Sequence, residues 1–494
     1  MPIKQVVIVG NGFAAWMTAS ALARALKETV TMIRVLPATD HAPDADDSLG
    51  VTVNAESSLP AMLQFHRLVG FDENELVRNT RAGFSLGTAI SNWSQQGVIF
   101  NPFGEVGAPL GPVNFLHVML RLRDEGQQLK LANFSLAALC AQAGRFSRPV
   151  MNDHSILSTL EYGLQLELGA YTEWLKKDAV THGVVQESSR FQQAALHQSG
   201  TVTHLVSEDG RRFSGDLFID CSGPSRTLAS QVHAEKFASW SQWMPCDRVT
   251  SSITPASEVP QSFVLLSAKD HGWLRTIDLP GRRYEQSYSS SAHGHNMSNE
   301  NSSSGSITYN IGAGYHPLPW QKNCIAMGGA ASVIDPVSSL QLHLFLAGVE
   351  RLIALFPNAA ECIQESVEFN RQSSAELECA RDYAIAHYKL NGRAGEPFWD
   401  ACRTMPVPDS LNHRIEVYKS TGRVVMHDGE VIDRMNWVAL FDAQNVRPVA
   451  YDVVARGIPL QLMNEHLNSI RQTLLAAVAT MPFYPAYLGQ IFSQ

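Results

Sequence analysis

The sequence predicts an α/β fold: a Rossmann-like nucleotide-binding module, an antiparallel β-sheet layer and a largely helical C-terminal module. Residues 2–22 carry the first observation, because the β-branched run VVIV at 6–9 ends in glycines and continues as a helical pattern. The second observation is the alternation of strand and helix patterns along residues 1–370, which is typical of a parallel sheet. Residues 371–494 are mostly helical in pattern, and we expect the antiparallel layer at about 236–310. The nucleotide-binding module is therefore discontinuous and spans 1–370.

The glycine turn after the first strand has the residues that a dinucleotide site requires. Gly10 allows a tight turn, and Gly12 lets the backbone approach a pyrophosphate. The helix that begins at Phe13 and Ala14 offers free N–H groups to phosphate charge. Ala15 stands where the fingerprint has its third glycine, a position that often accepts alanine. An N-terminal secretory signal is the alternative, but a charged helical pattern continues beyond residue 22 without a break.

Bulk composition favours a cytoplasmic enzyme without a metal. The chain has 494 residues, and its net charge of −9 gives no electrostatic support for nucleic-acid binding. No later segment has the length and charge-free character of a membrane span. The seven cysteines form no CxxC pair, and the histidines show no HExxH spacing. A metal site at His293 and His295, in the Ser- and Asn-rich loop expected at 286–306, has only weak support.

Several later segments extend the predicted sheet. Residues 30–35 form the expected second strand, and Arg34 stands near its end, where an acid would normally bind a ribose hydroxyl. A helix is predicted over 161–179, a strand from 183, and an Asp-Gly hairpin over 201–212. Strands at 215–223 and 324–329 both end in glycine, and a helix over 340–355 follows the second. These glycine-bearing strand ends predict one nucleotide-binding sheet built from distant segments.

Eight segments together resemble one enzyme family in the right order and over nearly the whole chain. They are GNGFAAWM, AESSLP, ELGAYTEWLKKDAVTHGVV, DGRRFSGDLFIDCSG, HGWLRTIDLP, CIAMGGAASVIDP, FWDACRTMPVPDSL and AVATMPFYPAYL. The chain is similar to the flavin-dependent tryptophan halogenases. The resemblance implies FAD rather than NAD, supplied in reduced form by a separate flavin reductase. It also implies a flavin module of the GR2 type joined to a helical substrate module, an indole-like aromatic substrate, and a homodimer.

The same resemblance identifies where the family's catalytic residues should be. In that family, reduced FAD and oxygen convert chloride to hypochlorous acid, which a lysine and a glutamate direct to the indole. The lysine of the stretch FKLG corresponds to Ser85, and the glutamate of EPLESTG corresponds to Ser338. Serine carries no cation, and its hydroxyl is no base near neutral pH without a partner. The Thr-Gly pair that helps to hold chloride is replaced by Leu340 and Gln341.

The WxWxIP motif of the family is also altered. The first tryptophan of the motif is present as Trp273. Arg275 stands in place of the second tryptophan, and Asp278 stands in place of the proline. Without the resemblance, Trp273 is better explained as an aromatic residue of the core. For Arg275, a surface ion pair and a role facing the flavin or a substrate anion are equally good explanations. If Arg275 occupies the vacated tryptophan position, it needs an anionic partner, for which Asp278 or Asp335 is the preferred candidate.

The resemblance further assigns flavin-binding positions to Glu56, Gly223, Gly328 and Asp335. It places the pair at 398–399 and the prolines 406 and 408 on a substrate-pocket wall, whereas pattern alone makes them core and loop. Three functions remain open. The chain is a flavin-dependent monooxygenase-like oxidoreductase with altered chemistry, a non-catalytic flavin- or ligand-binding homologue, or a halogenase that uses substitute residues such as Arg275.

Overall fold

The computed structural model describes residues 2–38, 48–50, 54–94, 97–256, 259–294, 307–359, 363–427 and 430–493. The chain forms two compact units, each assembled from three separate stretches. The first unit comprises residues 1–82, 166–251 and 306–378. The second comprises residues 83–165, 252–305 and 379–494. The division differs from the expected boundaries, because most of the antiparallel layer groups with the C-terminal helices.

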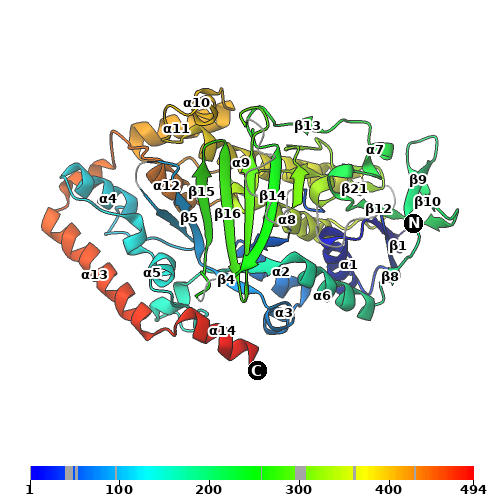
Figure 1. The fold of residues 1–494 in the computed structure, drawn as a ribbon, viewed down its shortest axis with the longest axis horizontal. Coiled ribbons are helices and arrows are strands. Elements are labelled where there is room, and N and C mark those ends of the chain that lie inside the picture. The colour runs from blue at the N-terminus through cyan, green and yellow to red at the C-terminus, as the bar shows by residue number, and fades with distance from the viewer. Residues whose placement is uncertain are drawn as a thin grey trace. The chain divides into compact units, whose positions relative to one another are not determined.

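A mostly parallel sheet forms the centre of the first unit (Figure 1). Its strands, in spatial order, are β20 (Trp320–Gln321), β21 (Cys324–Ala326), β12 (Leu217–Asp220), β1 (Gln5–Val9), β2 (Met32–Leu36) and β8 (Val185–Gln186). Only β20 runs antiparallel to its neighbour. Because β1 pairs with β12 and β12 pairs with β21, the three glycine-ended strands are adjacent. The prediction of one sheet built from distant segments is confirmed.

The parallel strands are apolar because both faces of the sheet are covered. A small antiparallel sheet packs against Val7, Val9 and Phe218. Its strands are β9 (Phe191–Leu196), β10 (Val202–Ser207) and β11 (Arg212–Ser214). The β10–β11 hairpin turns at Asp209-Gly210, as predicted. Val6 and Ile8 point to the opposite face and are fully buried.

Helix α1 packs against α6 and α8 in the first unit. The helices are α1 (Phe13–Ala25), α2 (Ala61–Val69), α3 (Glu73–Thr80), α6 (Leu168–Thr181), α7 (Ala229–Val232), α8 (Leu340–Ala354) and the first part of α9 (Ile363–Lys389). Short strands complete the unit: β3 (Ala55–Ser57), β13 (Ala238–Ser239), β18 (Ile307–Asn310), β19 (Gly314–Tyr315) and β22 (Ser332–Val333). The helix expected over 161–179 begins only at Leu168, because the preceding residues form a strand.

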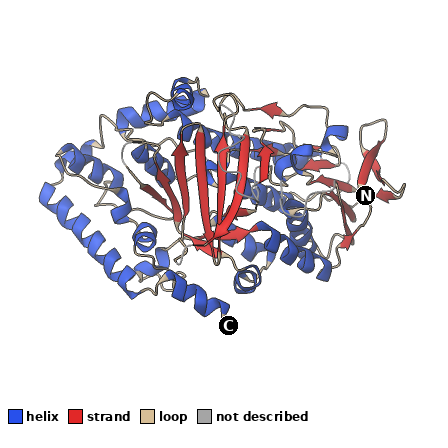
Figure 2. Cartoon of the chain, viewed as in Figure 1, coloured by secondary structure: helices blue, strands red, loops and turns tan. Residues whose placement is uncertain are grey.

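An antiparallel sheet forms the centre of the second unit (Figure 2). Its order is β18, β14 (Arg248–Pro255), β17 (Arg282–Ser289), β16 (Gly272–Leu279), β15 (Val264–Lys269), β5 (Gly87–Ser91) and β6 (Ile99–Pro102). Strand β15 is parallel to β5 and antiparallel to β16. A smaller, three-stranded sheet contains the antiparallel strands β4 (Gly83–Ser85) and β7 (Gly163–Glu167). The loop expected from residue 286 begins later, because β17 continues to Ser289, and residues 295–306 lie outside the described part.

The rest of the second unit is helical, as the pattern after residue 371 predicts. Its helices are the end of α9, α4 (Phe115–Asp124), α5 (Leu136–Gln142), α10 (Pro397–Thr404), α11 (Asp409–Thr421), α12 (Arg434–Ala443), α13 (Leu460–Thr480) and α14 (Tyr484–Phe492). Within the described ranges, no helix is long and apolar enough to cross a lipid bilayer.

Candidate functional site

The turn between β1 and α1 is built around two glycines with different tasks. Gly10 has φ +143°, and a Cβ there would lie 2.6 Å from the carbonyl oxygen of Cys221. The fold therefore requires glycine at this position. Gly12 is the N-cap of α1 at φ −89°, and its cap has no side-chain hydrogen bond. The first turn of α1 contains no acidic residue, so its amide end favours an anion.

Two glycine-bearing segments from distant parts of the chain meet this turn. The Cys221 amide donates to the carbonyl of Val9 at 2.8 Å, which holds the end of β12 beside β1. Gly223 begins a short 3-10 helix with φ +70°. Gly328, at φ +60°, begins another, and a Cβ there would lie 3.2 Å from that of Ala14. The predicted cofactor positions Gly10, Gly223 and Gly328 thus follow adjacent strands of one sheet.

Ser48 joins the first turn of α1 to the turn at Gly328. Its Oγ accepts a hydrogen bond from the Ala14 amide at 3.0 Å, and its carbonyl accepts one from the Gly329 amide at 2.8 Å. Ser48 is buried. One amide that a phosphate would use is therefore already engaged by this hydroxyl. Ser48 is not among the residues that the sequence predicts for this site, because a single serine in a polar loop gives no pattern.

Asp220, at the end of β12, organises the neighbouring loop. Its carboxylate accepts hydrogen bonds from the amides of Ser222, Leu228 and Ala229 at 2.9, 3.1 and 2.7 Å. Burial raises the pKa of Asp220, although these hydrogen bonds oppose the shift. The carboxylate thus fixes the loop that follows the strand.

The ribose end of the site differs from the expectation for Arg34. Strand β2 ends at Leu36, and the carbonyl of Leu36 accepts from the Gly10 amide at 2.9 Å. Arg34 lies inside the strand and forms an ion pair with Glu187 at 2.6 Å. Glu187 also accepts from Arg211 at 3.0 Å. Arg34 is therefore not at the strand end, and the residue that stands there is apolar.

Three other predicted flavin positions are buried in the first unit. The Glu56 carboxylate lies in β3 and accepts from the Ser57 amide at 2.8 Å. The Phe13 ring packs with centroids 5.3 Å from Tyr171, so its side chain belongs to the core. Ala15 is fully buried in α1, where a small side chain keeps the helix close to the turn.

The segment between β22 and α8 is held together by its own side chains. Asp335 caps a 3-10 turn by accepting from the Val337 amide at 3.1 Å. Gln341 accepts from the Ile334 amide at 2.8 Å and donates to the carbonyl of Ser332 at 2.9 Å. The Gln341 side chain therefore lies against the backbone of its own loop. Ser338 belongs to the same 3-10 turn, and its side chain lies outside the described residues.

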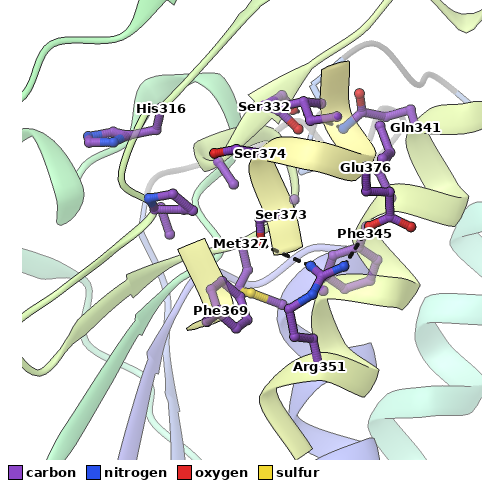
Figure 3. Close-up of a pocket in the computed structure, with 17 residues that line it drawn as sticks. His316, Met327, Ser332, Gln341, Phe345, Arg351, Phe369, Ser373, Ser374 and Glu376 are labelled. Carbon is purple, nitrogen blue, oxygen red and sulfur yellow. Dashed lines mark hydrogen bonds and ion pairs between the residues drawn. The ribbon is translucent and has the colours of Figure 1, made fainter. Parts of the chain in front are cut away.

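A narrow pocket lies beside Gln341, between α8 and α9 (Figure 3). Arg351 donates to Ser373 at 2.9 Å and to Glu376 at 2.6 Å, as the dashed lines in Figure 3 mark. Burial acts to raise the pKa of Glu376, but hydrogen bonds and charges from His343 and Arg351 outweigh it and leave that pKa lowered. These mutually satisfied charges connect the two helices.

In the second unit, Ser85 is fully buried at the end of β4. Its hydroxyl donates to the carbonyl of Gly87 at 3.3 Å, a long contact within the same loop. Tyr484 holds the preceding residue, because its hydroxyl accepts from the Phe84 amide at 2.7 Å. The serine thus fills space inside a closed backbone turn.

Trp273 and Arg275 lie on β16, and the side chain of each contacts a residue of the neighbouring strand β17. Trp273 stacks on Tyr288 with centroids 4.1 Å apart, and its indole N–H donates to the Tyr388 hydroxyl at 2.8 Å. Arg275 is 1% exposed and donates to the amide oxygen of Gln286, its cross-strand neighbour, at 3.3 Å. Both side chains are therefore held in the interior of the unit.

Of the two carboxylates expected as partners of Arg275, Asp278 and Asp335, the first pairs with another arginine. Residues 275 and 278 are separated by an odd number of positions, so their side chains leave opposite faces of β16. Asp278 faces Arg283 across the strands and accepts from its Nε and Nη2 at 2.6 and 2.9 Å. Cross-strand register is the signal that would have found this pair.

The residues expected on a substrate-pocket wall form an aromatic cluster. Trp399 lies 5.3 Å from Trp93 between ring centroids, and its indole N–H donates to the carbonyl of Lys269 at 2.7 Å. Phe398 packs against Trp399 and lies 5.6 Å from His293. His295 lies outside the described residues. No cluster of three metal-ligating side chains occurs in the described part of the chain.

Comparison with known proteins identifies the family. The tryptophan halogenase family model matches residues 5–459, so the chain belongs to this family. The tryptophan 6-halogenase SttH of Streptomyces toxytricini is 26% identical over 447 residues, which cover 84% of each chain. Among solved structures, the flavin-dependent halogenase BrvH from Brevundimonas sp. BAL3 superposes with TM-score 0.92 at 29% identity, covering 99% of both chains.

A flavin-dependent halogenase from Xanthomonas campestris gives the same TM-score of 0.92 at 27% identity, again over 99% of both chains. The fold class is therefore that of the flavin-dependent halogenases, and the chain is a halogenase-like oxidoreductase by family. The family uses FAD, and the glycine cradle at Gly10 with the uncapped α1 terminus fits a dinucleotide.

Proposed function

We propose that this protein is an FAD-dependent oxidoreductase that uses oxygen on an aromatic, indole-like small molecule without chlorinating it in the usual way. The observation that carries the flavin part is the convergence of the strand ends at Gly10, Gly223 and Gly328 on the amide end of α1. The relatives named above are tryptophan and flavin-dependent halogenases, which supports an indole-like substrate.

In this proposal, backbone amides rather than charged side chains bind the phosphate groups. The amides of the first turn of α1 and the dipole of that helix attract the pyrophosphate, and Gly12 lets it approach. Ser48 yields the Ala14 amide when a phosphate oxygen takes its place. When bound, reduced FAD supplies the electrons that activate dioxygen.

The halogenating step lacks its two expected groups. Ser85 has no ammonium to hold or polarise hypochlorous acid, and its hydroxyl is turned to the carbonyl of Gly87. A serine at 338 has no pKa suited to removing a ring proton near neutral pH. Gln341 fills the loop expected to hold chloride with its own amide.

Two partners belong to the proposal. A separate flavin reductase delivers reduced FAD, as the family membership implies. Homodimer formation and a cytoplasmic location are carried over from the resemblance and the composition, and both stay predictions.

A non-catalytic flavin- or ligand-binding role is the second candidate. Two hydrogen bonds favour it: the Ser85 hydroxyl donates to the carbonyl of Gly87, and the Gln341 side chain accepts from the Ile334 amide. Side chains that bond to their own loops in this way are not held ready for a substrate.

The two candidate functions predict different rates of NADH and oxygen consumption when a substrate is added. Purified protein, FAD, NADH and a flavin reductase are mixed in air, and NADH and oxygen consumption are recorded with and without a panel of indoles. An oxidoreductase increases consumption with at least one indole and forms a product heavier by oxygen. A binding homologue shows FAD binding but no substrate-dependent increase over the reductase alone.

A further inference from the structure

The second unit contains a large pocket, two of whose lining residues, Gly144 and Ser262, accept backbone hydrogen bonds from Tyr484 and Leu86. Its volume is about 1030 Å³, which is at the upper end of small-molecule sites. One face of β5, β6 and β15 forms its floor. The walls come from the segment before the 3-10 helix at 131–134, the end of α5 and the end of α12.

The floor of the pocket is apolar because neighbouring strands present their side chains to the same face. Ala89 is the cross-strand partner of both Phe100 and Leu265, so the three side chains lie in one row. Phe263 meets Phe100 edge to face with centroids 5.5 Å apart. At the rim, Val98 is 66% exposed. A ligand here gains apolar contact across three strands.

The wall of the pocket carries more positive than negative charge. Arg123, Lys130 and Arg447 line it, and Asp442 is the only acid among the described lining residues. Asp442 accepts from Arg123 at 2.7 Å and also pairs with Arg447. Arg447 remains 45% exposed at its side chain, so its guanidinium has donors to spare beyond one carboxylate. The wall therefore has a net charge of +2 when its four ionised groups are summed.

We propose that this pocket binds an organic carboxylate with an extended apolar body. The carboxylate lies at Arg447 and Lys130, where the excess positive charge is, and the body lies on Phe100, Phe263 and Leu265. A neutral apolar molecule would make no use of the excess positive charge of the wall, and an organic cation would be repelled by it. The proposal is independent of the proposed function, because it uses none of the flavin-site residues.

A fluorescent fatty-acid analogue, 11-(dansylamino)undecanoate, tests the charge requirement. We expect saturable binding at one site per chain with a blue shift of emission, and at least about 10-fold weaker binding of its neutral methyl ester. Arg447→Ala and Lys130→Ala should each weaken the carboxylate by about 10-fold and leave the ester unchanged.

Arg423→Ala is the matched control, because Arg423 pairs with Asp452 at 3.0 Å on another surface of the same unit. It should leave binding unchanged. If the ester binds as tightly as the acid, or if Arg447→Ala and Arg423→Ala behave alike, the carboxylate assignment is wrong.

Leu265→Glu tests the floor, because it places an acid in the row beneath the ligand body. Binding of the carboxylate should be lost, whereas Ile253→Glu, at a residue 47% exposed on β14, should have no effect. Circular dichroism checks that both variants fold, and Arg447→Ala keeps the proposal testable if Leu265→Glu does not. One-for-one displacement of the probe by FAD would place the probe in the flavin site and overturn the proposal.

Discussion

Two segments of the first unit, the turn between β1 and α1 and the turn between β22 and α8, satisfy their backbones in opposite ways. The first keeps glycine at positions 10 and 12, and no side chain of the N-cap residue closes the helix end. The second is closed by Asp335 and Gln341, whose side chains take up the amides of Val337 and Ile334. The first turn thus leaves backbone amides to an anion, whereas side chains already occupy the amides of the second.

The difference between the two turns supports the proposal that this chain keeps a flavin-binding fold without the usual chlorinating chemistry. Gly10 is required by the sheet itself, since a Cβ there would collide with the carbonyl of Cys221. Ser85 and Gln341 instead make hydrogen bonds within their own loops. Loss of the long Ser85 hydrogen bond should cost the fold little, whereas Gln341 bridges two buried backbone groups and its loss should cost more.

Gly12→Val gives the largest expected effect on the first turn. The φ of −89° at Gly12 suits any residue, so the fold should survive, but a branched side chain blocks the approach of a pyrophosphate. We expect FAD affinity to fall by at least about 100-fold in a fluorescence-quenching titration. Gly312→Val is the control, because a Cβ at Gly312 meets open space. Equal FAD binding by Gly12→Val and the wild type would show that the phosphate turn is elsewhere.

Ser85→Lys tests whether the lost ammonium can simply be returned. The Ser85 side chain is fully buried, so an ammonium there must be desolvated, and we expect a loss of about 2–5 kcal/mol in unfolding free energy. Ser85→Ala removes only a 3.3 Å hydrogen bond and should cost about 1 kcal/mol or less. Urea denaturation measures both. A lysine variant as stable as the wild type would mean that the site retains a place for the cation.

Gln341→Ala tests the closure of the second turn. It removes the partners of the Ile334 amide and the Ser332 carbonyl, both of them buried, and should lower the unfolding free energy by about 2–3 kcal/mol. Gln142→Ala, on the exposed end of α5, provides a glutamine control with an effect below about 0.5 kcal/mol. If the two variants unfold at the same urea concentration, Gln341 does not hold its loop.

Ser48→Ala tests whether the first turn of α1 can be made more accessible, because it removes the hydroxyl that accepts from the Ala14 amide. Without the hydrogen bond from Ala14, the FAD-free protein should lose about 1 kcal/mol, and FAD should bind about 2–10-fold more tightly. Ser135→Ala removes an N-cap serine from α5 and should lower stability alone. Weaker FAD binding by Ser48→Ala would make the hydroxyl a ligand rather than a competitor.

Much of the fold followed from local pattern. The run at 6–9, the Asp-Gly hairpin and the glycine-ended strands are signals of period and turn chemistry, and the pairing of β1, β12 and β21 agrees with them. The boundary at Leu168 was missed, because an apolar strand that runs directly into a helix gives no break in hydrophobicity.

Tertiary partners could not be read from the sequence in the same way. The contact of Ser48 with Ala14 joins positions 34 residues apart, and no local rule encodes it. The pairing of Asp278 with Arg283 depended on strand register, and so did the placement of Arg275 beside Gln286. Register is fixed by burial on a whole sheet, so the charge of Asp278 could not show that it pairs with Arg283 rather than with Arg275.

The most direct test of the central claim is a single reaction of the wild-type protein with FAD, NADH, a flavin reductase, oxygen, chloride and tryptophan. FAD saturation is followed by absorption in the same sample, and tryptophan is analysed by mass spectrometry. We expect FAD to bind at one equivalent per chain and the tryptophan to carry no chlorine above a control without the protein. Chlorotryptophan that depends on the protein would contradict the claim that the flavin fold has been kept without its halogenating residues.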